Sequence, residues 1–142
     1  MNIKTVTEIK NELIKYGDIV DAKTYSPGTS GNISHRYDKN KMIISATGSS
    51  NGSLTYEDLV IADYDGNLIE GSRKPSSEKM LHAQFYKMRP DINAIIHVHP
   101  VFLSTFAAVH KALDEPIMAE NVFYFGQIPL AEYGLPSSMD LV

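Results

Sequence analysis

The sequence contains no cysteine and no long hydrophobic run. Without cysteine no disulfide framework and no thiolate metal site can form, so a bound metal must use His, Asp or Glu. No apolar stretch approaches the roughly eighteen residues of a membrane-spanning helix. The N-terminal Met1-Asn2-Ile3-Lys4 leads into an amphipathic segment and not into the apolar core of a secretion signal. We therefore expect a soluble, cytoplasmic protein with no membrane partner.

Positive charge is not concentrated anywhere along the chain. There are 13 Lys and Arg against 17 Asp and Glu, which gives a formal net charge of -4. The lack of a basic cluster argues against nucleic acid or an anionic membrane as a partner. The length of 142 residues, 43% of them hydrophobic, favours one globular domain with a single core and excludes a disordered chain.

Local patterns predict helices interleaved with β-hairpins. Thr5 and Glu8 have the spacing of a capping box, so a helix is expected to begin there, and Gly17 is expected to end it. Turn residues that join two short runs predict two hairpins, one from 33–37 with 42–45 and one from 60–64 with 68–70. Because no regular βαβ repeat is visible, we predict a mixed, largely antiparallel sheet with helices packed on it.

Further helical segments are expected in three places. A short piece is predicted around 54–59, a helix from about 78 to 88 and another from about 101 to 110. The second of these has Ser76 or Ser77 in position to cap its first turn, and Pro90 marks its end.

A strand that ends in two histidines is the most direct indication of function. In the run 94–100, His97 and His99 are two residues apart, so in an extended strand both project from one face while Val98 faces the core. Neutral imidazoles suit zinc, but a catalytic zinc usually has three protein ligands. The alternative is a pair of ordinary half-buried histidines. His82 is expected to be a packing or hydrogen-bonding partner.

Three segments rich in glycine and hydroxyl residues offer backbone and side-chain donors to an anion. They cover residues 28–32, 47–50 and 75–78, and the last lies at the start of a predicted helix. Together they form a candidate phosphate cradle, although each by itself is also an ordinary turn. Glu78 is then either a surface carboxylate that compensates the helix dipole, or a general acid/base or metal ligand beside the histidines.

Four motifs in this order resemble the class II aldolase/adducin family, and within it most closely the L-fuculose-phosphate aldolases. They are Gly-Thr-Ser-Gly-Asn-Ile-Ser at 28–34, Ala-Thr-Gly at 46–48, Pro-Ser-Ser-Glu at 75–78 and His-Val-His at 97–99; segments 128–133 and 136–138 also match. The resemblance implies an α/β fold of three layers, α/β/α, around a central mixed, largely antiparallel sheet. Residues 1–142 are then a single class II aldolase/adducin-type domain, the N-terminal two-thirds of the family domain, apparently truncated at its C-terminus.

The resemblance also implies an activity, a cofactor and roles for particular residues. The expected protein is a zinc-dependent lyase that cleaves a ketose 1-phosphate, such as L-fuculose 1-phosphate, to dihydroxyacetone phosphate and an aldehyde. Zinc would act as a Lewis acid, held by His97 and His99, with Glu78 as acid/base and candidate ligand. The sugar phosphate is the expected small-molecule partner, and a homotetramer with active sites at subunit interfaces is the expected assembly. The phosphate would be bound by Gly31, Asn32, Thr47, Gly48, Ser76 and Ser77.

Two departures from the family pattern leave alternatives open. The family's third zinc histidine lies in a His-Gly segment downstream of Val142, and Glu120 stands near the place of a tyrosine thought to reach a neighbouring site. Alternatives within the family are a ribulose-phosphate 4-epimerase, which tends to carry aspartate where Glu78 stands, and a methylthioribulose-phosphate dehydratase. A non-catalytic, adducin-like assembly module is the alternative outside enzymology, and the presence of both histidines argues against it.

Overall fold

A computed structural model describes residues 4–136, 138 and 140. The chain divides into two compact units, one comprising residues up to His99 together with the segment from Gly134 onward, the other comprising Pro100–Tyr133. The two units are described separately below. The expectation of one family domain over residues 1–142 stays a prediction.

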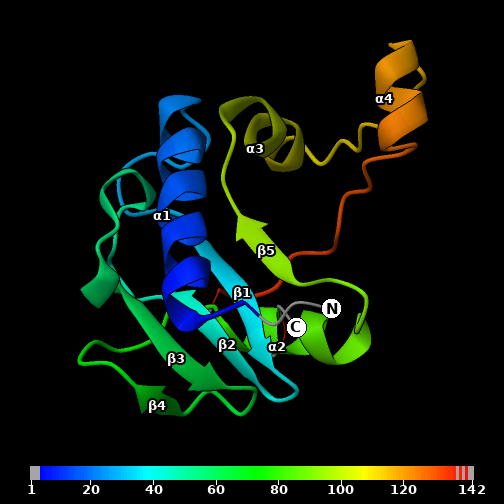
Figure 1. The fold of residues 1–142 in the computed structure, drawn as a ribbon. Coiled ribbons are helices and arrows are strands. Elements are labelled where there is room, and N and C mark those ends of the chain that lie inside the picture. Colours follow the sequence, from blue (N-terminus) through cyan, green and yellow to red (C-terminus); the bar gives the residue numbers. More distant parts are fainter. Residues whose placement is uncertain (1–3, 137, 139, 141–142) are drawn as a thin grey trace. The chain divides into compact units, whose positions relative to one another are not determined.

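The first unit is built on a five-stranded sheet with the strand order β4-β3-β2-β1-β5 (Figure 1). Every strand pairing among the described residues is antiparallel, and both predicted hairpins are present. The last strand in sequence, β5, pairs with β1 so that His97 lies opposite Asn32. The strands are β1 (Asn32–Asp38), β2 (Lys41–Ser45), β3 (Leu59–Asp63), β4 (Leu68–Glu70) and β5 (Ala94–His97).

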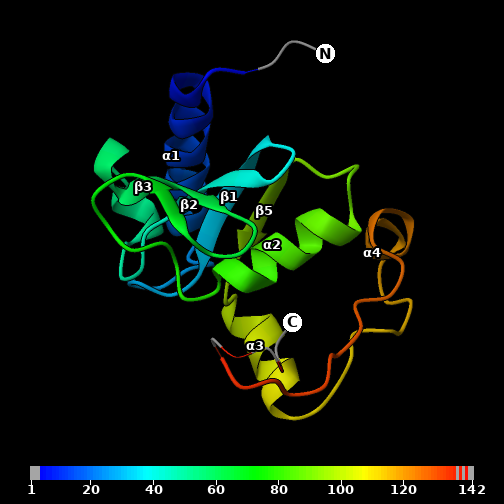
Figure 2. The same ribbon diagram turned by 90° about the horizontal axis from the view of Figure 1, so that it is seen from below.

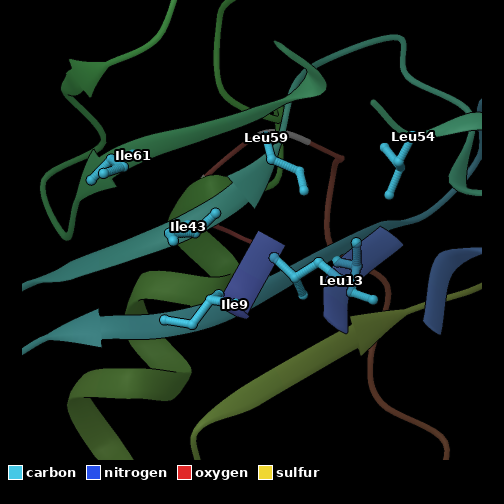
Figure 3. Close-up of a cluster of buried hydrophobic side chains, with 7 residues drawn as sticks. Ile9, Leu13, Ile43, Leu54, Leu59 and Ile61 are labelled. Carbon is cyan, nitrogen blue, oxygen red and sulfur yellow. The ribbon is translucent and has the colours of Figure 1, made fainter. Parts of the chain in front are cut away.

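Helices α1 (Val6–Ala22) and α2 (Lys79–Met88) cover opposite faces of this sheet (Figures 1 and 2). Side chains alternate between the two faces along each strand. Ile43 and Ile61 therefore pack in one cluster with Ile9 and Leu13 of α1, as Figure 3 shows. Their strand neighbours pack in a second cluster with α2; they are Met42, Ile44, Val60 and Ala62. This arrangement confirms the three-layer α/β/α prediction.

The first helix begins as predicted but ends later. The Thr5 hydroxyl accepts a hydrogen bond from the Glu8 N–H at 3.2 Å, and the Glu8 carboxylate accepts one from the Thr5 N–H at 2.7 Å. The prediction that Gly17 ends the helix is wrong, because α1 continues to Ala22. A Cβ atom at position 17 would lie 2.4 Å from the carbonyl oxygen of Asn51. Glycine is there to let the helix approach a 3₁₀ turn closely.

Two 3₁₀ turns take the place of the short helical piece expected around 54–59. They are η1 (Asn51–Ser53), which α1 approaches, and η2 (Tyr56–Asp58). In the second unit, α3 (Val101–Ala108) confirms the predicted helix and ends two residues early, and α4 (Ala119–Tyr124) follows. Mutual backbone hydrogen bonds between Leu113 and Ile128 join the segments around α4. None of the described helices has the length and apolar character needed to cross a membrane.

Candidate active site

A cleft of about 460 Å³ lies in the first unit, where the loops before β1, after β2 and before α2 meet the end of β5. Every residue that the sequence analysis assigned to metal, proton transfer or phosphate lines this one cleft. The lining residues are Thr29, Gly31, Asn32, Ala46, Thr47, Gly48, Ser76, Ser77, Glu78, His97, His99 and Pro136.

The two histidines reach the cleft in a way that differs from the sequence prediction. Strand β5 ends at His97, so His99 lies beyond the strand and not within it, and Val98 is only half-buried. The chain is held there because the His99 N–H donates to the carbonyl oxygen of Tyr25 at 2.9 Å. The two imidazole rings nevertheless lie with their centroids 4.9 Å apart. Proximity of the pair therefore comes from the path of the chain just after the strand.

The electrostatic surroundings of His97 favour a neutral ring. Burial lowers the pKa of His97, and the neighbouring His99 lowers it further, while the Glu78 carboxylate acts in the opposite direction. Its Nδ1 atom is buried and has no hydrogen-bond partner within the described part of the chain. A neutral imidazole with an unused nitrogen is the form that binds a metal.

The donor set for a metal is nevertheless incomplete within the part of the chain that the structure describes. Among the described residues, no group of three or more His, Asp or Glu side chains is arranged to hold a metal ion. The unpartnered His97 nitrogen and the adjacent His99 ring fit two positions of a histidine-rich metal site.

Gly31 allows the loop before β1 to contact the end of β5. Its φ of +74° is in the left-handed region, and a Cβ atom there would lie 2.4 Å from the His97 carbonyl oxygen and 2.6 Å from Ser26 Oγ. The Ser26 hydroxyl donates to the Ser30 carbonyl and accepts from the Asn51 amide, which fixes the loop from behind. Only glycine satisfies both the backbone angle and the space.

The loop after β2 is fastened to the segment before α2. Backbone hydrogen bonds join Thr47 N–H to the Lys74 carbonyl and Ser76 N–H to the Ser45 carbonyl, both at 3.0 Å. Arg73 adds hydrogen bonds to the Thr47 carbonyl and the Ser49 hydroxyl, and forms an ion pair with Asp58. Arg73 thus acts on the cleft through a loop, a role that no motif in the sequence indicated.

Helix α2 starts within one residue of the prediction and ends at Met88 as predicted, but its N-cap residue differs. The helix begins at Lys79 and its N-cap residue is Glu78, so neither Ser76 nor Ser77 is the N-cap. The buried Ser76 hydroxyl instead accepts a hydrogen bond from the Glu78 N–H at 3.2 Å, in the turn that precedes the helix. Ser77 and Glu78 still lie at the positive end of the helix dipole, which favours an anion beside them.

His82 is a hydrogen-bonding partner, as expected, and it is fully buried. Its Nε2 lies 2.5 Å from the Asn32 side-chain oxygen and its Nδ1 lies 2.7 Å from Ser34 Oγ. The connection to the cleft residue Asn32 was missed, because it depends on α2 packing across β1 and not on any spacing in the sequence.

Comparisons with known proteins bear on this cleft. The family described as Class II Aldolase and Adducin N-terminal domain matches residues 11–141. An L-fuculose phosphate aldolase of Methanococcus maripaludis is 41% identical over 133 residues, which cover 90% of this chain and 72% of that protein. A 3-oxo-tetronate 4-phosphate decarboxylase of Haemophilus influenzae is 34% identical over 134 residues, covering 91% of this chain and 63% of that protein. Methylthioribulose-1-phosphate dehydratases also match.

Among solved structures, one of an L-fuculose 1-phosphate aldolase superposes with a TM-score of 0.86 at 30% sequence identity. The superposition covers 99% of this chain and 66% of that one. The chain therefore spans about two-thirds of the length of the aldolase and decarboxylase relatives, and its match covers 46% of the dehydratase.

Proposed function

The chain belongs to the class II aldolase and adducin family, and on that premise we propose that it acts as a zinc-dependent sugar-phosphate aldolase. The proposed reaction cleaves a ketose 1-phosphate, such as L-fuculose 1-phosphate, to dihydroxyacetone phosphate and an aldehyde. The observation that carries the proposal is the single cleft that brings two histidines, a carboxylate and three donor-rich loops together.

The phosphate end of the substrate is assigned to the donor-rich side of the cleft. The lining residues include no Lys or Arg among those described, so neutral donors must hold the anion. Backbone N–H groups in the turns at Gly31 and Gly48 and the hydroxyls of Thr47 and Ser77 are of the required kind. The N-terminus of α2 adds a favourable dipole.

His97 and His99 are the residues that would hold the metal. A divalent ion bound there supplies a Lewis acid that polarises the substrate carbonyl. The low pKa of His97 serves this role because the ring does not need to lose a proton before it binds the ion.

Glu78 is assigned the proton transfers. When the C3–C4 bond breaks, the C4 hydroxyl becomes the aldehyde carbonyl and its proton must leave, and C3 must later receive a proton. The Glu78 carboxylate, half-buried in the same cleft, takes the first proton and returns one to C3. Such transfer contributes about 10²–10⁴-fold in rate.

The test is an assay of dihydroxyacetone phosphate after incubation with L-fuculose 1-phosphate and Zn²⁺. Product that depends on added metal supports the proposal, and absence of product from the folded, metal-loaded chain removes it. Ser76→Ala serves as a companion variant: we expect a raised KM at similar kcat, because the turn that carries the phosphate donors is loosened in ground and transition states alike.

A second candidate function is supported by the decarboxylase among the relatives. A phosphorylated 3-oxo acid would present the same phosphate to the same donors and would release carbon dioxide in place of an aldehyde. Measuring carbon dioxide release from 3-oxo-tetronate 4-phosphate beside the aldolase assay separates the two reactions.

We further propose a cytoplasmic homo-oligomer, a tetramer on the family's pattern. The large apolar side chains left exposed on α3 and α4, such as Phe102 and Phe123, support an assembly that covers them. Light scattering of the purified chain measures its mass directly, and a monomer at micromolar concentration contradicts this proposal.

A further inference from the structure

A row of four buried polar side chains runs from the wall of the cleft into the layer between the sheet and α2. Asn32 and Ser34 are two residues apart on β1 and so face the same side, toward His82 and Tyr86 of α2. His82 lies 2.5 Å from Asn32 and 2.7 Å from Ser34, and Ser34 Oγ lies 2.7 Å from the Tyr86 hydroxyl. All four are at least nine-tenths buried.

The chemistry of these groups decides which partner donates in each hydrogen bond of the row, and so gives the row a direction of donation. The Asn32 side-chain oxygen can only accept, so the His82 Nε2 atom carries the hydrogen. A neutral imidazole has one N–H, so Nδ1 accepts from the Ser34 hydroxyl, and the Ser34 oxygen accepts from the Tyr86 hydroxyl. Ser34 is the hydrogen-bond partner of the Tyr86 hydroxyl among the described residues. Every polar group in the row then has a partner.

Reversing every donor and acceptor leaves one hydrogen-bond donor of the row without a partner. If the Asn32 amide nitrogen faced His82, then Nδ1 would donate to Ser34 and Ser34 would donate to Tyr86. The Tyr86 hydroxyl would then hold a hydrogen with no acceptor among the described residues, because its partner there is the Ser34 hydroxyl, which would already donate to it. A buried unmade hydrogen bond is costly, so the first direction is preferred.

This direction decides which end of the Asn32 amide faces the cleft. With its oxygen bonded to His82, the remaining group is the NH₂, which makes no hydrogen bond to any described residue and is not a buried orphan. Asn32 lines the cleft, whose described lining includes no cationic side chain. Turning the amide around would replace a donor to an anion by an oxygen that repels it.

We propose that His82 is a positioning residue: its Nε2–H holds the Asn32 oxygen and thereby presents the Asn32 NH₂ to the substrate phosphate. The inference rests on the phosphate subsite of the proposed function. It assigns a role to a residue that lies behind the cleft and does not touch its contents.

The tautomer of His82 is the first test and needs no variant. ¹⁵N NMR of the full chain should find Nε2 protonated and Nδ1 unprotonated at neutral pH, and the Asn32 NH₂ resonances should move on titration with inorganic phosphate. A proton on Nδ1, or Asn32 resonances that do not respond while phosphate binds elsewhere in the cleft, overturns the proposal.

Three variants then test the effect on affinity for inorganic phosphate, measured by calorimetry. His82→Leu removes the N–H, and we expect the Kd to rise about tenfold or more, the loss typical of a hydrogen bond to a charged group. His82→Gln retains an N–H donor and an acceptor and should restore the Kd to within about threefold. Tyr86→Phe deletes the far end of the row, keeps the His82 to Asn32 bond, and should leave the Kd unchanged.

A double-mutant cycle separates positioning from general damage. In an Asn32→Ala background, His82→Leu should cause no further loss of phosphate affinity, since the residue through which it acts is gone. Additive losses overturn the proposal. If His82→Leu does not fold, the His82 tautomer and the Asn32 resonances of the wild-type chain still decide whether the proposal holds. A wild-type chain that binds no phosphate refutes the proposed function together with this inference, whereas tight binding by the His82→Leu variant refutes the inference alone.

Discussion

Replacing Gly31 by alanine should destabilise the chain far more than the same change at Gly28, in the same loop. Both glycines have a positive φ, +63° at Gly28 and +74° at Gly31. The left-handed conformation costs an alanine about 1–2 kcal/mol, and the lower entropy of the unfolded chain returns about 0.4–1 kcal/mol. The net backbone effect is therefore about 1 kcal/mol at either position.

The two positions differ in the space around the added methyl group. At Gly28 no atom lies within 4 Å of the new Cβ, whereas at Gly31 the His97 carbonyl oxygen lies at 2.4 Å and Ser26 Oγ at 2.6 Å. Neither neighbour can yield easily, because one is backbone at the end of β5 and the other is a hydroxyl held by Asn51. Overpacking of this kind costs about 1–3 kcal/mol. We expect Gly31→Ala to lose about 2–4 kcal/mol and Gly28→Ala about 1 kcal/mol.

Urea denaturation followed by circular dichroism measures both losses. The difference between the two variants isolates the contact between the loop and β5, because the backbone term is common to both. Equal losses would refute the view that Gly31 is required by close approach to His97. Binding of the proposed zinc ion is a second readout: Gly31→Ala should weaken it and Gly28→Ala should not, since only the former displaces the backbone of His97, a proposed metal ligand.

Four further predictions concern the cleft and the helix behind it. Glu78→Gln should lower kcat by about 10²–10⁴-fold with phosphate affinity unchanged; full turnover in the aldolase assay contradicts the acid/base role. His97→Ala should lose bound zinc after dialysis, and metal analysis showing unaltered zinc would place the site elsewhere. Burial, with a smaller contribution from His97, lowers the pKa of His82 to about 3, so the unfolded chain binds a proton more readily below about pH 6.5. Stability should thus fall as the pH drops below that value, by up to about 1.4 kcal/mol per pH unit, and this component should be missing from His82→Gln when the two are compared by urea denaturation. Finally, Arg36 donates to the carbonyls of Tyr86, Arg89 and Ile92, and its guanidinium lies 4.8 Å from the centre of the Tyr86 ring. In urea denaturation, Arg36→Met should lower the free energy of unfolding by about 2–4 kcal/mol. The control Arg89→Met breaks only an exposed pair with Asp91 and should lower it by less than about 1 kcal/mol.

The elements that were predicted correctly depend on short stretches of sequence. The capping box at Thr5 and Glu8 and the hairpin of β3 and β4 are formed by residues a few positions apart, and both are present. The apolar runs of β2 and β3 are buried on both faces of the sheet, in the two clusters against α1 and α2. Local patterns were sufficient here because local contacts determine these features.

The errors occurred where distant residues decide the outcome. Gly17 has the character of a helix stop, yet α1 continues because the glycine packs against the Asn51 carbonyl. The serines before α2 look like N-caps, yet backbone bonds from Ser76 and Thr47 tie this segment to the β2 end of the sheet, and Glu78 is the N-cap instead. Propensity is a weak guide when tertiary contacts of this kind compete with it.

The sequence by itself determined the chemical inventory of this protein. The absence of cysteine leaves histidine and carboxylate as metal ligands, the ordered motifs identify the family, and the donor-rich loops indicate an anion subsite. Tertiary structure alone decided how these groups are presented. Pairing of β5 with β1 buries the unpartnered nitrogen of His97 beside Gly31, and packing of α2 on β1 orients the Asn32 amide through His82. Burial and long-range pairing set the protonation state and direction of a polar group, and neither is determined by the residues adjacent to it in the chain.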